Sequence, residues 1–488
     1  MTRDTDPEET ILLHRDDRES GPITANLTSN LQTLMHILKA NIGPGFLGMA
    51  FTVQHAGLLL GPFSLLVLGI VSTHCMQILV DSSHNLCKRT GCAALDYGCL
   101  AHDAIQQSSN TKLNSYGNIG RHVVNTFLVL TQLGFCCIYF IFISDNFQQV
   151  IINLILNVRQ NVCYTFFHIV HIVINIQYID SSTLTTPVIQ IFMAILAIAF
   201  ILLSYIRNLD TLSIFSAVAN LLIVIAVVIT YEYLISGISE GKTDLSSLPL
   251  AKSISAYPIF FGTAVFAFEG IGVVLPVENK MQHPHYFKHV LYIGMAIVVV
   301  LFVSMGTLGY MRFGHDVADT ITLNLPQNQR LYISVKIMFS MAVFVSYAVQ
   351  FYVPIEITWP TLRDKLPERF QTFGEYVYRT ILVLITFGFG ALIPKLGLFI
   401  SLIGSLLGSS LIMIFPPIID ELVFYNGYKK PSAVLRLTKN TIIVLLGFFG
   451  FIFGTLVSII NLVDAFKPVT NIGNMTTIHT TEMTPTSF

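Results

Sequence analysis

The sequence predicts an all-α polytopic membrane protein with eleven transmembrane helices, and three observations lead to that fold class. Hydrophobic residues make up 53% of the 488-residue chain and charged residues only 11%, against about 25% charged in an average soluble protein. Apolar runs close to the ~20 residues needed to cross a bilayer recur along the chain. Lys and Arg residues are unevenly divided between the segments that separate these runs. The net charge of -1 gives no reason to expect a nucleic-acid partner.

Eleven apolar windows are long enough to cross a bilayer. They cover residues 29–53, 57–80, 122–143, 186–206, 213–236, 256–276, 289–311, 331–354, 378–393, 397–418 and 441–463. We therefore expect a cytosolic tail over 1–28, a transmembrane domain over 29–463 and an extracellular or luminal tail over 464–488. The apolar stretch 163–178 is short and is interrupted by two histidines, so we place it outside the bilayer.

The distribution of positive charge supports this count. With the N-terminus in the cytosol, cytosolic segments hold 18 of the 27 Lys and Arg residues, and the opposite side holds 7. An excess of this kind on the cytosolic side is what the positive-inside rule describes. Two lysines remain inside spans. One of them, Lys336, lies near the outer end of the eighth span, and we expect its side chain to extend toward the membrane surface.

The first span contains turn chemistry where a continuous helix would be expected. Residues 34–50 read LMHILKANIGPGFLGMA, with Pro44 between Gly43 and Gly45. Unpaired backbone groups cost several kcal/mol each in hydrocarbon, so a broken helix persists only inside protein or beside a watery cavity. We interpret the segment from Asn41 to Gly45 as a functional interruption of the helix.

The sixth span is interrupted in a comparable way. In FFGTAVFAFEGIGVVLP (260–276), Gly270 and Gly272 follow Glu269. The break lies five spans after the first one, so its helix enters the membrane the other way up and the two helices form an inverted pair. Paired interrupted helices at corresponding positions of two halves are the sequence sign of a transporter's central binding site. By contrast, we interpret Gly404 and Gly408 in the tenth span as packing glycines.

Two such breaks suit an amino acid as substrate. The N-terminus of a half-helix exposes N–H donors and the positive end of its dipole to a carboxylate, and unwound carbonyls accept from an ammonium group. We expect the carboxylate near Gly43 and Gly45, and the ammonium near the carbonyls of Phe266 and Phe268. The candidate substrate-binding residues are Asn41, Ile42, Gly43, Gly45, Phe266, Phe268 and Gly270.

Two ionisable residues lie near these breaks, and we assign both to proton coupling. His36 precedes Asn41 by five residues, about 7.5 Å along a helix, and its ordinary pKa of about 6.5 lets it change charge near neutral pH. Glu269 directly precedes Gly270, where an uncompensated charge would cost at least ~2.5 kcal/mol, so we expect it to be protonated or paired with Lys39. The structural alternatives, a packing histidine and a buried ion pair, remain open.

Longer stretches resemble the proton-coupled amino acid transporters of the amino acid/auxin permease group. They are GTAVFAFEGIGVVLPVENKM (262–281), LTQLGFCCIYFIFISDNFQQV (130–150), IRNLDTLSIFS (206–216), LGYMRFG (308–314), ITLNLP (321–326) and QFYVP (350–354). The likeness covers about residues 30–460.

The resemblance implies ten helices in a five-plus-five inverted repeat, an eleventh helix, and symport of small neutral amino acids with a proton at the plasma or lysosomal membrane. It places the family's proton-linked histidine on His36 and its sixth-span motif on Phe266 to Gly272. Relatives generally read GNIGTG where this chain reads ANIGPG, and Pro44 removes a backbone donor there.

The most favoured function is therefore symport by alternating access, with the proton as co-substrate and no other cofactor. The alternative is a low-flux amino-acid sensor that signals to cytosolic partners. Glu8, Leu12 and Leu13 form an acidic dileucine pattern of the kind that endosomal and lysosomal sorting adaptors bind. Sodium coupling, with hydroxyl ligands from Ser340 and Ser346, is a third possibility. We expect neither a metal site nor an enzyme, because the chain has no zinc-type cysteine spacing, no HExxH motif and no paired intramembrane aspartates.

Overall fold

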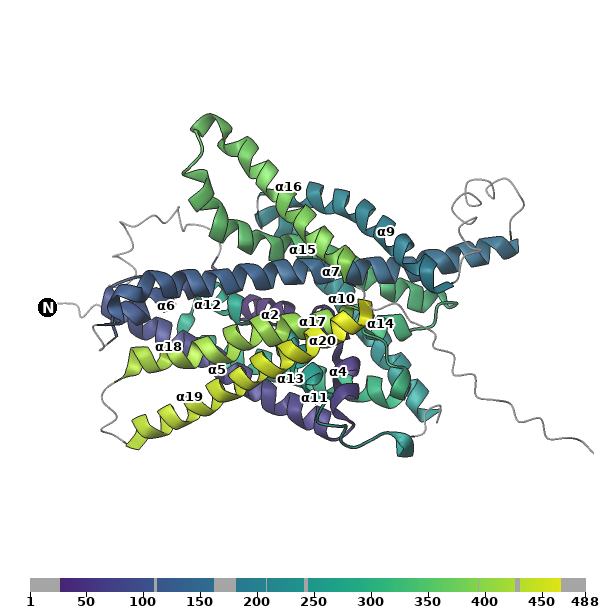
Figure 1. The fold of residues 1–488 in the computed structure, drawn as a ribbon, viewed down its shortest axis with the longest axis horizontal. Coiled ribbons are helices and arrows are strands. Elements are labelled where there is room, and N and C mark those ends of the chain that lie inside the picture. The colour runs from purple at the N-terminus through teal and green to yellow at the C-terminus, as the bar shows by residue number, and fades with distance from the viewer. Residues whose placement is uncertain are drawn as a thin grey trace, which may run out of the picture.

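The computed structural model describes residues 27–108, 112–161, 181–207, 209–240, 245–393, 395–425 and 431–466. Within these ranges the regular structure is helical, apart from one isolated bridge between Thr28 and Met281. Most of the long helices run along the longest axis of the molecule (Figure 1). The N-terminal dileucine and the apolar stretch 163–178 lie outside the described residues, as do nearly all of the two predicted tails.

Nine helical segments of the described chain are apolar and long enough to cross a bilayer, and the protein is a multi-pass membrane protein. They are α5 (Leu60–Thr90), α7 (Gly117–Asn161), α10 (Leu209–Ser239), α11 (Tyr257–Ala267) with α12 (Ile271–Asn279), α13 (Phe287–Phe313), α15 (Arg330–Arg363), α16 (Glu368–Leu392), α17 (Leu396–Ile403) through α18 (Phe415–Phe424), and α19 (Pro431–Phe449) through α20 (Thr455–Phe466).

Two further segments fall on predicted spans. The first span is divided into α2 (Asn30–Asn41), α3 (Pro44–Leu47) and α4 (Met49–Ala56). The fourth corresponds to α9 (Ser181–Ser204), which includes the apolar stretch Met193–Ser204. All eleven windows are thus occupied by helix in the expected order, while the number of membrane crossings itself stays a prediction.

Short helices connect the long ones. They are α6 (Tyr97–Gln106), α14 (Ile321–Asn324) and the 3₁₀ turns η1 (Asn114–Tyr116), η3 (Leu245–Ser247), η4 (Pro284–Tyr286) and η5 (Gly314–Asp316). Asp96 caps α6, since its side chain accepts from the Cys99 amide at 2.6 Å.

Several helices extend beyond the predicted windows. α5 continues past residue 80 to Thr90, where Gly91 adopts a left-handed φ of 71° and closes the helix. α7 reaches Asn161 and not residue 143, and α15 reaches Arg363 and not residue 354. The helices are longer than the windows because hydropathy detects only the apolar part of a helix, whereas the helix itself continues until a cap or a breaker ends it.

Glycines let the tenth span approach the sixth closely. A Cβ added to Gly404 would overlap the carbonyl oxygen of Gly262 on α11, and one added to Gly408 would lie 3.1 Å from the Val265 side chain. The interpretation of these two residues as packing glycines is therefore confirmed. The chain here winds as two π-helical turns, η6 (Gly404–Gly408) and η7 (Ser410–Ile414), and η8 (Gly450–Gly454) forms a third between α19 and α20. Such turns bend a helix locally.

An aromatic cluster holds the third, fourth and eighth spans together. Phe200 on α9 stacks on Tyr347 of α15 with ring centroids 3.8 Å apart, and it meets Phe140 of α7 edge-on at 4.6 Å. All three rings are buried. Contacts of this kind add stability beyond the area that they bury, so these helices form a firm support beside the breaks.

Candidate functional site

The first helix break is confined to two residues. α2 ends at Asn41, and both Ile42 (φ -91°, ψ 94°) and Gly43 (φ -149°, ψ -155°) are extended before α3 begins at Pro44. Proline suits this first helical position, because its φ is already helical and its missing N–H would have had no partner inside the helix. The predicted interruption of the first span is therefore confirmed, and Pro44 starts the second half of the span.

The peptide groups of this break are available to a ligand. Neither the Gly43 amide nor the Gly45 amide donates to a backbone carbonyl among the described residues, whereas the Phe46 amide donates to the Gly43 carbonyl at 3.0 Å. A Cβ added to Gly43 would meet no atom within 4 Å, so this glycine faces open space. An anionic group placed there would meet N–H donors that nothing else in the described chain occupies.

The second break, between α11 and α12, spans Phe268 to Gly270. The Phe268 amide donates to Ala264 at 3.1 Å as the last helical bond of α11, and α12 starts after Gly270. Inside the break, the Glu269 amide donates to the Phe266 carbonyl at 3.2 Å and the Gly270 amide to the Phe268 carbonyl at 2.9 Å. Each of these carbonyls keeps a second lone pair for another donor.

The two phenylalanines of this segment present their main chain to the break and pack their rings elsewhere. The Phe266 ring lies against Phe135 of α7, with centroids 4.5 Å apart, and the Phe268 ring lies against Phe302 of α13 at 4.9 Å. Both side chains are buried. Substitution of either ring would therefore change helix packing before it changed any contact with a ligand.

The two breaks touch each other. A Cβ added to Gly45 would lie 2.9 Å from the Ala267 Cα and 3.2 Å from the Phe266 ring. One added to Gly270 would lie 2.9 Å from the Asn41 side-chain nitrogen. Residues more than 200 positions apart in the sequence are thus brought into van der Waals contact, and glycine is needed at both positions for this close approach.

Four buried polar atoms around the breaks have no hydrogen-bond partner in the described chain. They are Asn41 Oδ1, Glu269 Oε2, Thr131 Oγ1 and Gln132 Oε1. Asn41 uses its nitrogen to donate to the Ile37 carbonyl at 2.9 Å, which leaves the oxygen free. Each such atom costs about 1–3 kcal/mol when it stays unpaired in a protein interior. A group of them in one place indicates a ligand site, and all four can accept hydrogen bonds.

Thr131 and Gln132 join the candidate site although the sequence analysis did not select them. The Glu269 carboxyl faces Thr131 of α7, and a Cβ on Gly272 would lie 3.7 Å from the Gln132 side-chain nitrogen. They are adjacent polar residues near the middle of the third span, within LTQLGF, and polar residues at that depth are a signal that could have identified them.

Glu269 was expected to be either protonated or paired, with Lys39 as the possible partner, and the structure does not form that pair. The ion pairs of the described residues do not include it. The Glu269 carboxyl is directed away from α2, toward the tenth span, where a Cβ on Gly408 would lie 3.5 Å from its Oε2. Spacing along a helix does not determine which neighbouring span a side chain faces, and here the carboxyl faces the other way.

His36 lies on a face of α2 that leads to the first break. His36 itself is exposed, and Lys39, Ala40 and Gly43 are partly exposed, at the three- and four-residue spacing of one helical face. The opposite face of α2, with Thr33, Ile37 and Asn41, is buried. The charges that act on His36 come from Lys39 and from Lys280 beyond the end of α12, and both are positive. A partly exposed face of α2 thus runs from His36 to the first break.

The other side of the breaks, toward α4, is closed by the segment that follows α13. Lys336 of α15 is only 1% exposed, and its Nζ donates to Gln149 Oε1 of α7 at 2.6 Å and to the Leu325 carbonyl at 3.2 Å. Gln149 in turn donates to the Leu323 carbonyl at 3.4 Å. The expectation that Lys336 extends toward the membrane surface is wrong, because α14 folds back over it and supplies buried acceptors.

Two more contacts fix this closure. Gln54 at the end of α4 donates to the His315 carbonyl at 2.9 Å, and Asp319 accepts from the Gly397 amide of α17 at 2.9 Å. The segment from Gly314 to Leu325 is thus tied to α4, α7, α15 and α17. The α4 side of the two breaks is therefore covered by this segment.

On the α2 side, the halves of the two broken helices are joined. The Thr28 amide donates to the Lys280 carbonyl at 2.9 Å, and the Gln282 amide donates to the Thr28 carbonyl at 3.0 Å. His84 of α5 lies 2.7 Å from the Glu278 carboxylate at the end of α12. A movement of α2 would therefore be transmitted to α12 and to the second break.

Comparison with known proteins identifies amino acid transporters as relatives of this chain. The family model for transmembrane amino acid transporter proteins matches residues 27–460. A Drosophila melanogaster protein named proton-coupled amino acid transporter-like protein pathetic is 32% identical over 452 residues, which is 91% of this chain and 88% of that protein. The Caenorhabditis elegans probable amino acid transporter skat-1 is 25% identical over 448 residues, 89% of this chain and 90% of that protein.

Among solved structures, the crystal structure of MhsT in complex with L-phenylalanine matches with a TM-score of 0.46 and 13% sequence identity. The match covers 90% of this chain and 99% of that one.

Proposed function

Because the chain belongs to the transmembrane amino acid transporter family, we propose that it moves small neutral amino acids together with protons across a membrane by alternating access. The observation that carries this proposal is the cluster of four buried, unpaired polar atoms around two helix breaks that touch each other. The name of the fruit-fly relative, which includes proton coupling, supports the choice of co-substrate.

The substrate would lie with its carboxylate at the first break. The amides of Gly43 and Gly45 donate to no backbone carbonyl of the described residues, and there is open space where a side chain on Gly43 would lie. Its ammonium would take the acceptors that have no other partner, Asn41 Oδ1 and Gln132 Oε1, together with the carbonyls of the second break. A neutral zwitterion uses both sets and leaves no further charge to be compensated.

A small side chain fits the site best. The glycine contacts between the two breaks are too close to admit additional atoms between them. Beyond the break, Phe46 and Phe302 stack at 5.8 Å and close the way toward α13. Glycine, alanine and proline are therefore the first substrates to test.

Proton coupling would use His36 and Glu269. His36 is exposed on the face of α2 that leads to the site, where it can exchange protons with water. Glu269 lies in the second break, and a proton on its carboxyl would remove a charge from the membrane interior and supply a donor to an otherwise unpaired group. One pH unit is worth ~1.4 kcal/mol and a carried charge gains ~2.3 kcal/mol per 100 mV. Together they support concentration gradients of several hundred-fold.

Alternating access would consist of opening one side and closing the other. In the described conformation the segment from Gly314 to Leu325 covers the α4 side of the breaks, and the partly exposed face of α2 would be the route to the other side. The reverse state would release Lys336 from Gln149 and Leu325 and bring α2 over the site. The bond between Thr28 and Lys280 would make α2 and α12 move together.

We expect the protein to reside in the plasma membrane or in lysosomal and endosomal membranes. The acidic dileucine of the N-terminal tail would direct it to the latter through sorting adaptors. In an acidic compartment, the proton gradient would drive amino acids from the lumen to the cytosol.

Radiolabelled uptake into proteoliposomes tests the proposal. Wild-type protein should take up glycine, alanine or proline faster as the outer pH falls from about 7.5 to about 5.5, and His36→Ala should lose this dependence. Replacement of sodium by choline should leave uptake unchanged. Equal uptake at both pH values would contradict proton coupling. Saturable binding with negligible flux, together with ligand-dependent capture of cytosolic partners, would favour the sensor instead.

A further inference from the structure

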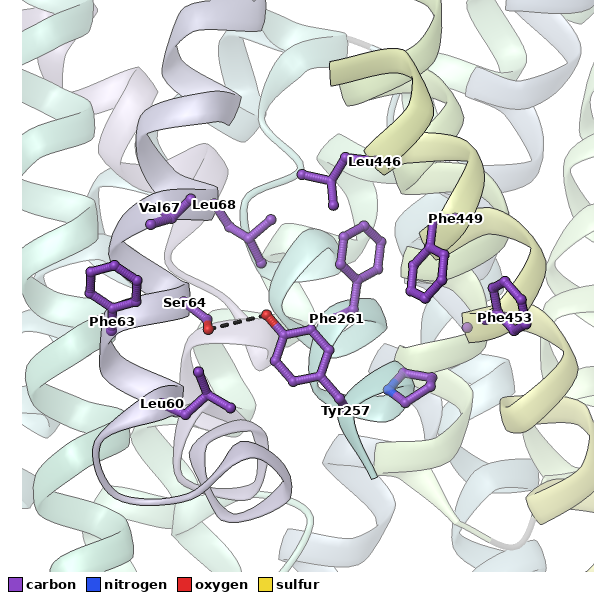
Figure 2. A pocket seen from close by; sticks show the side chains of 13 residues that line it. Leu60, Phe63, Ser64, Val67, Leu68, Tyr257, Phe261, Leu446, Phe449 and Phe453 are labelled. Atoms are coloured by element: carbon purple, nitrogen blue, oxygen red, sulfur yellow. Dashed lines mark hydrogen bonds between the residues drawn. The ribbon is translucent and has the colours of Figure 1, made fainter. Parts of the chain in front are cut away.

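A second hollow lies away from the breaks, between α5, α11 and the bend of α19 at η8 (Figure 2). Its volume is about 340 Å³, which falls within the range of small-molecule pockets. Phe63, Leu68, Phe261, Phe449 and Phe453 account for most of its walls. This hollow has no part in the proposed transport cycle.

The bend at η8 creates the hollow. A Cβ on Gly450 would overlap the Phe261 ring, so this glycine lets α19 approach α11 closely at one point. Gly454 likewise packs on Ser405, with no room for a Cβ. Around these two contact points the larger side chains diverge, and the space between α19 and α5 stays unfilled, as Figure 2 shows between Leu68, Phe261 and Phe449.

The exposure of the lining residues shows that the hollow opens sideways, out of the helix bundle. Phe63 is 63% exposed and Phe449 53%, whereas Ser64 is 6% and Phe261 4% exposed. The exposed rings therefore form the rim and the buried residues form the floor. All three helices belong to segments that are long and apolar enough to cross a bilayer, so we take the medium at this rim to be lipid. Only a molecule dissolved in the bilayer can enter from there.

The hollow is polar at one end only. Tyr257 donates from its hydroxyl to Ser64 Oγ at 3.1 Å, and this is the bond drawn in Figure 2. Tyr257 is the first residue of α11, and Ser64 lies in the first turns of α5, so the pair sits near one membrane boundary. Phe261 and Leu68 are four residues further along their helices, about 6 Å toward the middle of the bilayer. The hollow thus offers hydroxyls at the boundary and hydrocarbon below.

We propose that this hollow binds a membrane sterol, with its hydroxyl beside Tyr257 and Ser64 and its rings between Phe261 and Phe449. A sterol has one hydroxyl at the end of a rigid, flat hydrocarbon body, and this distribution matches the hollow. A phospholipid also has ester carbonyls at this boundary, but its flexible acyl chain would lose conformational freedom on entering a preformed slot, a cost that a rigid sterol avoids. The part of the sterol that exceeds the volume of the hollow would remain in the surrounding lipid.

Occupancy would act on the sixth span. Phe261 lies on α11 only a few residues before Phe266, where the helix approaches the second break. A rigid body held against Phe261 would limit the tilt of α11 and so link the sterol content of the membrane to the transport cycle. Binding itself does not depend on the proposed transport activity.

Photolabelling of the full-length protein in lipid nanodiscs tests the proposal. One probe is cholesterol that carries a diazirine, and the other is phosphatidylcholine with a diazirine in its acyl chain. The sterol probe should label α5, α11 or α19 saturably, and excess unlabelled cholesterol should remove the label. Leu446→Trp, which fills the hollow from its rim, should reduce labelling about five-fold or more. Leu445→Trp is the matched control, because Leu445 is 62% exposed on the same helix and does not line the hollow.

Tyr257→Phe gives a second, milder variant. It removes one hydroxyl and keeps the ring, so labelling by the sterol probe should fall about three- to five-fold, while labelling by the acyl probe stays unchanged. Size-exclusion chromatography shows whether each variant is folded. If Leu446→Trp does not fold, the labelling of Tyr257→Phe alone tests whether the hollow binds a sterol. Labelling that does not saturate, equal losses with Leu445→Trp and Leu446→Trp, or stronger labelling by the acyl probe would overturn the sterol assignment.

Discussion

Substitution of Gly45 by alanine tests whether contact between the two breaks holds the site together. The added methyl would lie 2.9 Å from Ala267 Cα and 3.1 Å from Ala267 Cβ, about 0.5–1 Å closer than ordinary carbon–carbon contact. The nearest of these atoms is backbone, so no side-chain rotation relieves the clash and the two breaks must separate. Overpacking of this kind costs about 1–3 kcal/mol.

The neighbouring glycine supplies the matched control. A methyl on Gly43 would meet no atom within 4 Å, and its φ of -149° is extended backbone that any residue adopts. Gly43→Ala should therefore change the free energy of unfolding by no more than about 0.5 kcal/mol. The same substitution is thus expected to destabilise the protein at position 45 and to leave its stability nearly unchanged at position 43.

Thermal unfolding of the purified protein and kinetic uptake assays measure the two effects. Gly45→Ala should lower the unfolding midpoint by about 1–3 °C and raise the KM for the amino acid about ten-fold or more, since displaced donors no longer meet the carboxylate. Gly43→Ala should keep the wild-type midpoint. A Gly45→Ala protein with both the midpoint and the KM of wild type would refute the close contact and the role that we give it.

Three further predictions concern charged groups. Glu269→Gln should make uptake independent of outer pH, because the amide cannot take up the transported proton; continued acid stimulation would exclude Glu269 from coupling. Lys336→Met leaves Gln149 Oε1 and the Leu325 carbonyl without their donor. In single-cysteine variants, it should increase the labelling of residues on the α4 side by impermeant thiol reagents. Unchanged labelling would contradict a role of Lys336 in closure. Arg379→Met removes one of the two arginines that pair with the buried Glu375 carboxylate, and Arg207 remains 2.7 Å from its other oxygen. The loss should destabilise the protein by about 1–3 kcal/mol, which thermal unfolding would detect.

The breaks were predictable because their causes are local. Pro44 removes a helical hydrogen bond, and the glycines on either side of it weaken the helix further. The chain is extended at Ile42 and Gly43 as expected. In the sixth span Gly270 marks the break, whereas Gly272 lies inside α12 and packs on Leu128. Sequence alone did not distinguish these two glycines, because a glycine that allows close helix packing and a glycine that breaks a helix are the same residue type.

The positions of charged side chains were less predictable, because tertiary contacts determine them. Lys336 and an ordinary interfacial lysine look alike in sequence, and only the fold of α14 over α15 shows that Lys336 is buried. Glu269 faces α7 and the tenth span and not Lys39, because the backbone conformation of the break sets the direction of its side chain. Thr131 and Gln132 became candidates only when the third span was seen beside the second break.

Protection of a single thiol by substrate tests the central claim most directly. In a variant without other reactive cysteines, Gly43→Cys would place a thiol in the open space beside the first break. Glycine, alanine or proline should slow the reaction of this thiol with a maleimide at concentrations near the KM for uptake, and they should not slow the reaction of a cysteine at the exposed position Leu445. If the variant still transports and the amino acid does not slow the reaction of the thiol at position 43 with the maleimide, the substrate does not bind where the two broken helices meet.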